Sequence, residues 1–277
     1  DNSAGVEVVL VAPNEKNWDN SFDRSVVLGE KTGIPLAPPF DAKVFNPGGF
    51  KDVKIESPIV EIPEFKRSAD FIRQARSALA VEVERIDSPE SAQKVLELLA
   101  IGVPVLLKEN DQAKAWLGTQ MASLLKEVDA EELQNPTSRE KVSVDLRRAA
   151  LGQHTIEKRL QQIRKQAGLT TFREPSVSVI VASNRPEMTE RIFNVVKEQD
   201  HKNLELIFAL HGDGFEDSYS DFLKGDLPVT VFRYPKETIF GNILSEASSA
   251  AKGDWIAKMD DDDWYGKEHI SDLLLAA

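Results

Sequence analysis

Four short apolar runs in the C-terminal part of the chain alternate with longer segments, and this alternation restricts the possible folds most strongly. The runs are residues 177–181, 204–210, 229–233 and 255–259. The first, VSVIV, is almost continuously β-branched, which is typical of a strand covered on both faces. Apolar residues at helical spacing follow Pro186 and occupy Phe240–Lys252, with Gly253 as the expected helix end. Strands separated by helices predict a parallel sheet with right-handed crossovers, and such sheets bind ligands beyond the carboxyl ends of their strands.

The N-terminal half shows a similar alternation from Ser68 onward. Leu79–Ile86, LAVEVERI, alternates as a strand with one solvated face does. Ser88 and Pro89 form an N-cap signal, and the helix that they open is expected to stop at Gly102. The other elements expected here are a strand within Ala4–Ala12, a strand at Pro104–Leu107, a helix around Asp111–Leu117 and a long helix at Arg139–Gln166 with Gly152 as its weak point.

Two segments are expected to lack regular helices. Residues 29–64 are rich in proline and glycine, which predicts loops with short strands. Thr170–Pro175, TTFREP, has no periodicity and contains a proline, so we place a domain boundary there. The length of 277 residues suits about two domains of ordinary size or one large one, and the boundary favours two. We therefore predict an α/β protein with two Rossmann-like domains, residues 1–170 and residues 176–277, the second with a mainly parallel sheet.

The composition excludes several classes of function. Lys and Arg number 34 against 46 Asp and Glu, a net charge of −12, which does not suit a general binder of nucleic acid or anionic lipid. The absence of cysteine excludes disulfides, zinc–thiolate sites and cysteine nucleophiles, and the four histidines lack HxxxH spacing. No apolar run approaches the roughly 20 residues of a membrane span, and no signal sequence opens the chain. Since the first residue is Asp1 and not Met, we expect upstream sequence to be missing.

The most specific motif is KMDDDDWYG, in which Asp260–Asp263 directly follow the last predicted strand. Adjacent carboxylates repel one another, so we expect a cation to offset them at the end of a buried strand. Oxygen ligands without His or Cys suit Mg²⁺ or Mn²⁺, which also take phosphate oxygens as ligands. The alternative is a solvated acidic turn. The tryptophans Trp116, Trp255 and Trp264 are expected in core or rim packing, with a sugar contact as the alternative for Trp264.

A second candidate is the loop ASNRP, between the first strand of the C-terminal half and its first helix. A helix N-terminus offers free N–H groups to an anion. Ser183 and Asn184, with the backbone of Ala182, suit contacts to a base or ribose, and Arg185 suits a phosphate. The alternative is an ordinary turn, since Ser, Asn and Pro are common turn residues.

Together these motifs occur in a specific order: VSVIVASNRP, MTERIFNVVKEQ, ELIFALHGDG and FGNILSEASSAAKGDWIAKMDDDDW. In this order, Pro175–Ala277 resembles the nucleotide-binding half of family 2 glycosyltransferases with the GT-A fold. The resemblance implies a nucleotide-diphospho-sugar donor, namely a UDP-, GDP- or dTDP-sugar, and a divalent metal. By position, Asp260 and Asp262 resemble the Asp-x-Asp pair, with Asp262 the better metal ligand and Asp260 nearer the ribose.

The resemblance also assigns roles to neighbouring residues. Asn242 resembles the residue that approaches the sugar-phosphate, and Asp261 contributes to donor binding or adds charge. Where the family usually has an aspartate that grips the base or ribose, this chain has HGD, so Asp213 and His211 are the candidates, with a plain turn as the alternative. The chain ends one helix beyond the acidic run. We therefore expect a C-terminally truncated domain whose general base and acceptor-binding part lie beyond Ala277.

The N-terminal half shows a fainter resemblance. SPESAQKVLELLAIGVPVLL and DLRRAALGQHTIEKRLQQI resemble the C-terminal Rossmann-like lobe of GT-B glycosyltransferases. Retaining members use two glutamates for the donor. Glu97 matches the second glutamate, whereas Pro89 stands at the position of the first and Glu90 is one residue away. The alternative for Glu97 is a solvated helix residue.

We therefore expect part of a glycosyltransferase that transfers a sugar to a glycan, such as a cell-wall polysaccharide, or to a lipid-linked acceptor. The alternatives are a catalytically incomplete nucleotide-sugar-binding or interaction module and a sugar nucleotidyltransferase, although the loop after the first strand lacks the glycines that the latter needs. The expected location is the cytoplasm, and the alternative is peripheral association with the inner face of the membrane.

Overall fold

The computed structural model describes residues 33–40, 55–61, 69–109, 111–215, 219 and 224–277. The chain divides into two compact units, Asp1–Phe172 and Arg173–Ala277, and this division falls within the segment predicted as a boundary. The strand expected within Ala4–Ala12 and most of the proline-rich region lie outside the described residues. No described helix is long and apolar enough to cross a membrane.

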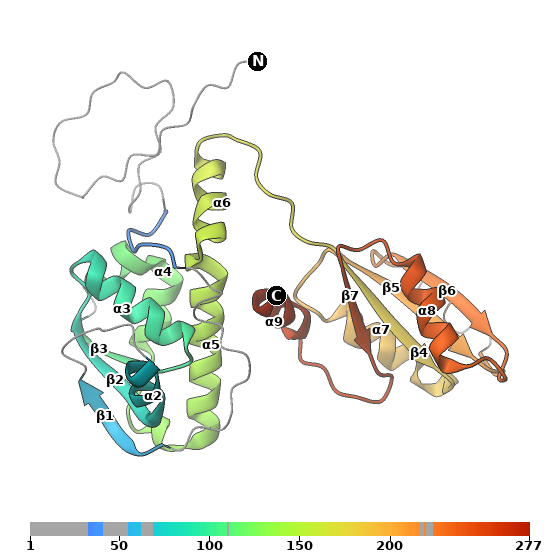
Figure 1. Cartoon of the computed structure of the whole chain (residues 1–277), viewed down its shortest axis with the longest axis horizontal. Helices are drawn as coiled ribbons and strands as arrows, with labels where there is room; N and C mark the ends of the chain where they lie inside the picture. The colour runs from blue at the N-terminus through green and yellow to red at the C-terminus, as the bar shows by residue number, and fades with distance from the viewer. Residues whose placement is uncertain (1–32, 41–54, 62–68, 110, 216–218, 220–223) are drawn as a thin grey trace. The chain divides into compact units, whose positions relative to one another are not determined.

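The first unit, unit 1, has a three-stranded parallel sheet in the order β1-β2-β3 (Figure 1). Its helices α3, α4 and α5 pack on one another, and α3 and α4 also pack on the sheet. The elements are β1 Ser57–Glu61, α2 Ala69–Ser77, β2 Ala78–Arg85, α3 Pro89–Ala100, β3 Val105–Glu109, α4 Ala113–Lys126, η1 Glu132–Gln134, α5 Pro136–His154 and α6 Ile156–Gln166.

Helix α3 begins and ends where the sequence predicts. The Ser88 hydroxyl accepts a hydrogen bond from the Ser91 N–H at 3.2 Å, and the Ser91 hydroxyl accepts one from the Ser88 N–H at 3.0 Å. Gly102 follows the helix with a φ of 78°, a left-handed conformation that glycine adopts at little cost. Local signals alone therefore define both ends of this helix.

The break between α5 and α6 differs from the prediction. It falls at Thr155, whereas Gly152 lies inside α5. Thr155 has extended backbone, caps α6 through its hydroxyl and forms an isolated β-bridge with Phe40. A contact from a segment 115 positions earlier therefore fixes the break, which helix propensity does not reveal. Helix α4 is also longer than expected and reaches Lys126.

The second unit, unit 2, has a four-stranded sheet in the order β6-β5-β4-β7, in which every pair is parallel. This confirms the predicted α/β architecture with a parallel sheet. The elements are β4 Val177–Ser183, η2 Pro186–Met188, α7 Thr189–Lys197, β5 Leu204–His211, β6 Val229–Tyr234, α8 Phe240–Ala250, β7 Trp255–Met259 and α9 His269–Ala276 (Figure 1).

Helices cover both faces of this sheet, because alternate residues of the central strands belong to different clusters. Val179 and Phe208 pack with α7 and α9, whereas Ile180 and Ile207 pack with α8. The ring of Phe208 meets that of Phe193 edge to face, with 5.6 Å between centroids. The central strands are therefore covered on both sides, as the β-branched runs predict.

Two expectations for unit 2 are wrong in detail. Pro186 opens a short 3-10 turn, and α7 begins only at Thr189. Strand β7 is not a buried strand: among the described strands it pairs only with β4, and Trp255 and Ile256 are about half exposed (49% and 50%). Both faces of an edge strand contact fewer neighbours, so its apolar composition does not ensure burial.

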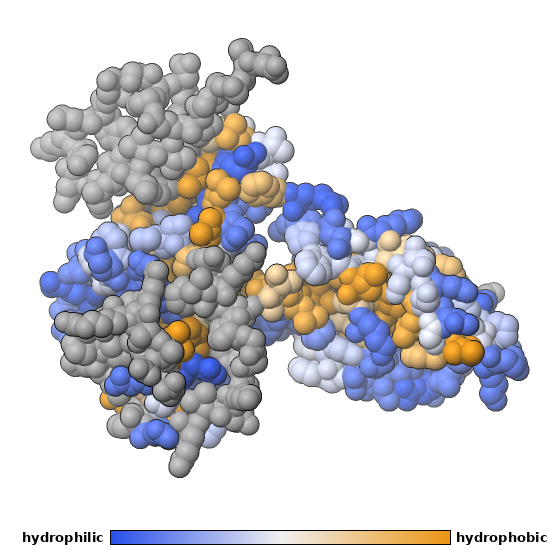
Figure 2. Space-filling model, in the orientation of Figure 1, coloured by the Kyte–Doolittle hydropathy of each residue, from blue (hydrophilic) through white to orange (hydrophobic). Residues whose placement is uncertain are grey.

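The surface of unit 2 carries apolar side chains among polar ones (Figure 2). Its exposed large apolar residues are Ile239, Phe240, Trp255, Ile256, Trp264 and Leu273. Trp255 and Trp264 are therefore outside the core, and Trp264 is 83% exposed directly after the acidic run. The core part of the prediction is therefore wrong for both tryptophans, whereas rim packing remains compatible with the half-exposed Trp255.

Candidate functional site

The candidate site lies where the strand order of unit 2 changes direction. The chain builds β4, β5 and β6 outward on one side, then returns to place β7 on the other side of β4. In parallel sheets, the loops that follow the two strands at such a point separate and leave a crevice for ligands. Here these loops are the two motifs that the sequence analysis selects, residues 182–186 after β4 and residues 260–266 after β7.

Asp261 connects the two loops. Its carboxylate is 7% exposed and accepts hydrogen bonds from the Ser183 hydroxyl and from Nη2 of Arg185. Arg185 Nε also donates to Asp261 Oδ2 at 3.0 Å, so the guanidinium holds the carboxylate through two nitrogens. A paired arginine and a hydroxyl satisfy a carboxylate that would otherwise be costly to bury. Asp261 is therefore the structural anchor of the acidic run.

Asp262 and Asp260 point into more open surroundings, with side chains that are 53% and 49% exposed. Arg185 Nη1 donates to Asp262 Oδ2 at 3.0 Å, and this hydrogen bond is the main reason why the pKa of Asp262 is lowered. Lys258 Nζ contacts Asp260 Oδ1. The Asp260 N–H donates to the Tyr265 hydroxyl at 2.8 Å, which fixes the backbone at the start of the run.

Side-chain cations offset the repulsion among the four aspartates. Arg185 and Lys258 pair with carboxylates, and Nη2 of Arg191 donates to the backbone carbonyls of Asp262 and Asp263 at 3.0 and 2.8 Å. The protein therefore offsets part of this repulsion with its own cations, and a bound divalent ion at the run stays a prediction. Among the described residues, no group of three or more His, Asp or Glu side chains is arranged to hold a metal.

The remaining candidates of unit 2 occupy the same edge of the sheet. His211 is the last residue of β5, and its Nε2 lies 3.1 Å from the Lys236 carbonyl. Asp213 and Asn184 are exposed in the loops that follow β5 and β4. Asn242 is exposed in the first turn of α8, which follows β6. Since all four strands are parallel, their following loops share the carboxyl edge.

Ala182 lies near the end of β4 and packs against Tyr234 and Ile243, which belong to β6 and α8. Glu97 belongs to unit 1, where it is 1% exposed in α3 and accepts a hydrogen bond from the Gln93 amide at 2.9 Å. The alternative of a solvated helix residue is therefore wrong for Glu97. Its role as a donor contact stays a prediction.

Gln199, the last residue of the MTERIFNVVKEQ motif, is a positioning residue to which the sequence assigns no role. It is 1% exposed, its amide donates to the Gly266 carbonyl at 2.9 Å, and its carbonyl accepts from the Ile270 N–H at 3.1 Å. These bonds attach the segment after the acidic run to the end of α7. A polar residue at the end of an amphipathic helix gives no sequence signal for such a long-range role.

Comparison with known families agrees with this geometry. Residues 178–277 match the family model described as glycosyl transferase family 2. The match covers the parallel sheet of unit 2 from the second residue of β4 onward, with both loops of the candidate site, and it supports glycosyltransferase activity for this part of the chain. No curated protein matched the chain.

Proposed function

We propose that unit 2 binds a nucleotide-diphospho-sugar at the crevice between β4 and β7 and takes part in transfer of its sugar. The observation that carries this proposal is the Ser183–Arg185–Asp261 network, which joins two polar loops at the switch point of a sheet that matches a glycosyltransferase family. A rigid, buried anchor between the loops leaves the flanking polar groups oriented toward solvent, where a ligand approaches.

The flanking groups suit the separate parts of such a donor. We assign the base and ribose to Asn184 and the end of β4, with Asp260 near the ribose and His211 or Asp213 at the base. The diphosphate is assigned to Arg185, whose planar guanidinium matches phosphate oxygens. Asn242, in the first turn of α8, is assigned to the sugar-phosphate.

The oxygen ligands that the acidic run offers suit a divalent ion. Mg²⁺ and Mn²⁺ commonly bind proteins through one or two carboxylates and complete their shells with water and substrate phosphate. Asp260 and Asp262 offer two half-exposed carboxylates on the same side of the run, whereas Asp261 is occupied by Ser183 and Arg185. The residues therefore fit an ion that arrives together with the donor, and do not provide a metal cage of their own.

In this proposal, Asp262 holds the ion with support from Asp260. When bound, the ion would offset the charge of the diphosphate leaving group. Arg185 then exchanges its contact with Asp262 for a contact with phosphate, while its Nε and Nη2 stay on Asp261. The acceptor is proposed to be a glycan or a lipid-linked sugar.

For unit 1 we propose a GT-B-like lobe spanning residues 1–170, followed by the GT-A-type domain at residues 176–277. The support is the order of β2, α3 and β3, which carries the SPESAQKVLELLAIGVPVLL pattern on a parallel sheet. Glu97 is proposed as a contact to a second donor.

Isothermal titration calorimetry tests the donor proposal. UDP-, GDP- and dTDP-sugars are titrated into the full chain with and without Mn²⁺. We expect one nucleotide class to bind in a metal-dependent manner, and Asp262→Ala to weaken that binding at least about tenfold, since one tenfold step corresponds to about 1.4 kcal/mol. Asp226→Ala is the matched control, because Asp226 is exposed and precedes β6, at the opposite edge of the sheet. Equal binding by wild type and Asp262→Ala, or metal-independent binding, would contradict the proposal.

A further inference from the structure

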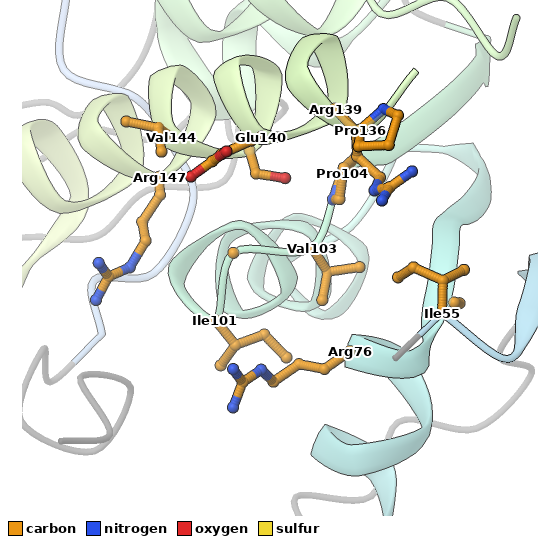
Figure 3. A pocket seen from close by; sticks show the side chains of 13 residues that line it. Ile55, Arg76, Ile101, Val103, Pro104, Pro136, Arg139, Glu140, Val144 and Arg147 are labelled. Atoms are coloured by element: carbon orange, nitrogen blue, oxygen red, sulfur yellow. The ribbon is translucent and has the colours of Figure 1, made fainter. Parts of the chain in front are cut away.

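Unit 1 contains a cavity of about 480 Å³ at the amino-terminal edge of its sheet. The walls come from the end of α2, the start of β2, the turn between α3 and β3, and the first half of α5. The residues used below are Arg76, Ile101, Val103, Arg139, Val144 and Arg147 (Figure 3). Parallel sheets of this class bind their usual ligands at the opposite, carboxyl edge, so this cavity is separate from any donor site of the lobe.

The cavity is cationic in a chain of net charge −12. Three arginines line it, and Glu140 is the only acidic residue among its described lining residues. Arg139 Nη1 donates to the Leu133 carbonyl at 2.9 Å, and Arg147 Nε donates to the Ala100 carbonyl at 2.9 Å. These bonds fix two guanidinium groups at the wall, so little side-chain entropy remains to be lost when an anion binds.

The rest of the wall is apolar. Val144, which is 36% exposed, offers apolar surface to the cavity from α5, and the α3–β3 turn closes it with Ile101 and Val103, each only 2% exposed. Figure 3 shows Arg139 and Glu140 reaching from α5 across the cavity from these two side chains, and Arg76 near Ile101. The volume lies within the range of about 300–1,000 Å³ that is typical of small-molecule sites, which combine an apolar lining with a few polar groups.

We propose that this cavity binds a small organic anion, with a carboxylate or phosphate group at Arg139 and an apolar body against Val144. Planar guanidinium groups pair with either head group through two parallel hydrogen bonds. Arg76 from α2 and Arg147 from further along α5 add positive charge to the same cavity. This proposal does not rest on the function proposed for unit 2.

A fluorescent organic anion, anilinonaphthalene sulfonate, is the probe for the test, titrated into the full chain. We expect saturable binding, which Arg139→Gln weakens about tenfold, in line with the loss of one charge-assisted pair. Arg148→Gln is the matched control. It removes the same charge from the same helix, but Arg148 does not line the cavity and instead lies 3.8 Å from Asp145. We expect it to change affinity by less than about twofold, the range of a screened surface charge.

A second variant, Val144→Trp, fills the cavity and leaves its charge unchanged. We expect it to weaken probe binding as well, while the Met121 methyl resonance, from the core of unit 1, shows that the fold is intact. Unchanged binding in both Arg139→Gln and Val144→Trp, or equal weakening by Arg148→Gln, would overturn the proposal.

Competition distinguishes the head groups and tests the apolar contact. Hexanoate and hexyl phosphate are added against the bound probe, with inorganic phosphate as the control that lacks an apolar body. We expect at least one hexyl compound to displace the probe, and the stronger competitor identifies the head group. Displacement by inorganic phosphate at the same concentration as the hexyl compounds, or by none of the three, would overturn the proposed amphiphilic ligand.

Discussion

His154 makes the stability of unit 1 sensitive to acid. The imidazole is fully buried in α5, and Nη2 of Arg159 lies 2.7 Å from its Nδ1. A guanidinium has no acceptor, so it must donate and Nδ1 must be unprotonated. Burial, and then the charge of Arg159, lower the pKa of His154 from 6.5 to about 3. Protonation would remove this hydrogen bond and place two like charges together.

The sign of the effect follows from linkage. The unfolded chain takes up a proton near pH 6.5, whereas the native protein does so only near pH 3. The stabilisation is therefore complete above pH 6.5 and is lost progressively as the pH falls toward 3. A difference of 1 in pKa is worth about 1.4 kcal/mol, so the whole effect is about 5 kcal/mol, and about 2 kcal/mol is already lost at pH 5.

The assay is urea unfolding at pH 7 and pH 5, monitored by the methyl resonances of the three methionines. Met121 reports on unit 1, whereas Met188 and Met259 report on unit 2. We expect the free energy of unfolding of unit 1 to fall by about 2 kcal/mol between these pH values. His154 is the only histidine of residues 1–172, so His154→Gln should remove most of this pH dependence.

The control is His269→Gln in unit 2, which should leave the pH dependence of unit 1 unchanged. If His154→Gln still loses about 2 kcal/mol of unfolding free energy between pH 7 and pH 5, the reasoning is refuted, because carboxylates would then cause the pH dependence. If the unfolding free energy of wild-type unit 1 does not fall between pH 7 and pH 5, His154 is not a buried neutral imidazole in the native protein.

Three further predictions use the same unfolding assay. Gly253→Ala should destabilise unit 2 by about 1–3 kcal/mol, since the added Cβ would lie 2.5 Å from a backbone nitrogen of β4. Gly152→Ala should instead stabilise unit 1 by about 0.5–1 kcal/mol, because Gly152 lies inside α5 and no atom lies within 4 Å of the added Cβ. Ser88→Ala should cost unit 1 about 1 kcal/mol through loss of its N-cap, and a cost below a few tenths would contradict the capping geometry. Arg185→Leu should destabilise unit 2 by about 1–3 kcal/mol, because it leaves the buried carboxylate of Asp261 poorly paired. Most of that loss should disappear when Asp261→Leu is added. Additive effects of the two substitutions would show that the side chains are not coupled.

The sequence predicts the strands of both units well, because short β-branched runs between helical segments leave few alternatives. It predicts the ends of α3 for the same reason, since Ser88 and Gly102 act on their own neighbours. It does not predict the break at Thr155, which depends on Phe40, or the positioning role of Gln199, which depends on a loop about 70 residues away. Contacts that are distant in the chain leave no local pattern.

The different surroundings of the four aspartates follow from the periodicity of the strand before them. In an extended chain, alternate side chains point to opposite sides. Met259 and Asp261 are buried, whereas Lys258, Asp260 and Asp262 are exposed. Burial therefore alternates from Lys258 to Asp262 and leaves Asp260 and Asp262 on the open side, although β7 ends at Met259 and residues 261–263 form a bend.

This alternation makes a specific demand on the proposed donor site. Asp262→Ala and Asp263→Ala each leave three aspartates and the same net charge, but only the first removes a carboxylate from an outward position next to the buried Asp261. We therefore expect Asp262→Ala to lose metal-dependent donor binding, whereas Asp263→Ala should retain it. Calorimetry with Mn²⁺ and the nucleotide-sugar that binds wild type compares the two variants. Equal binding by both would mean that total negative charge, and not the alternation of burial along the run, determines the site.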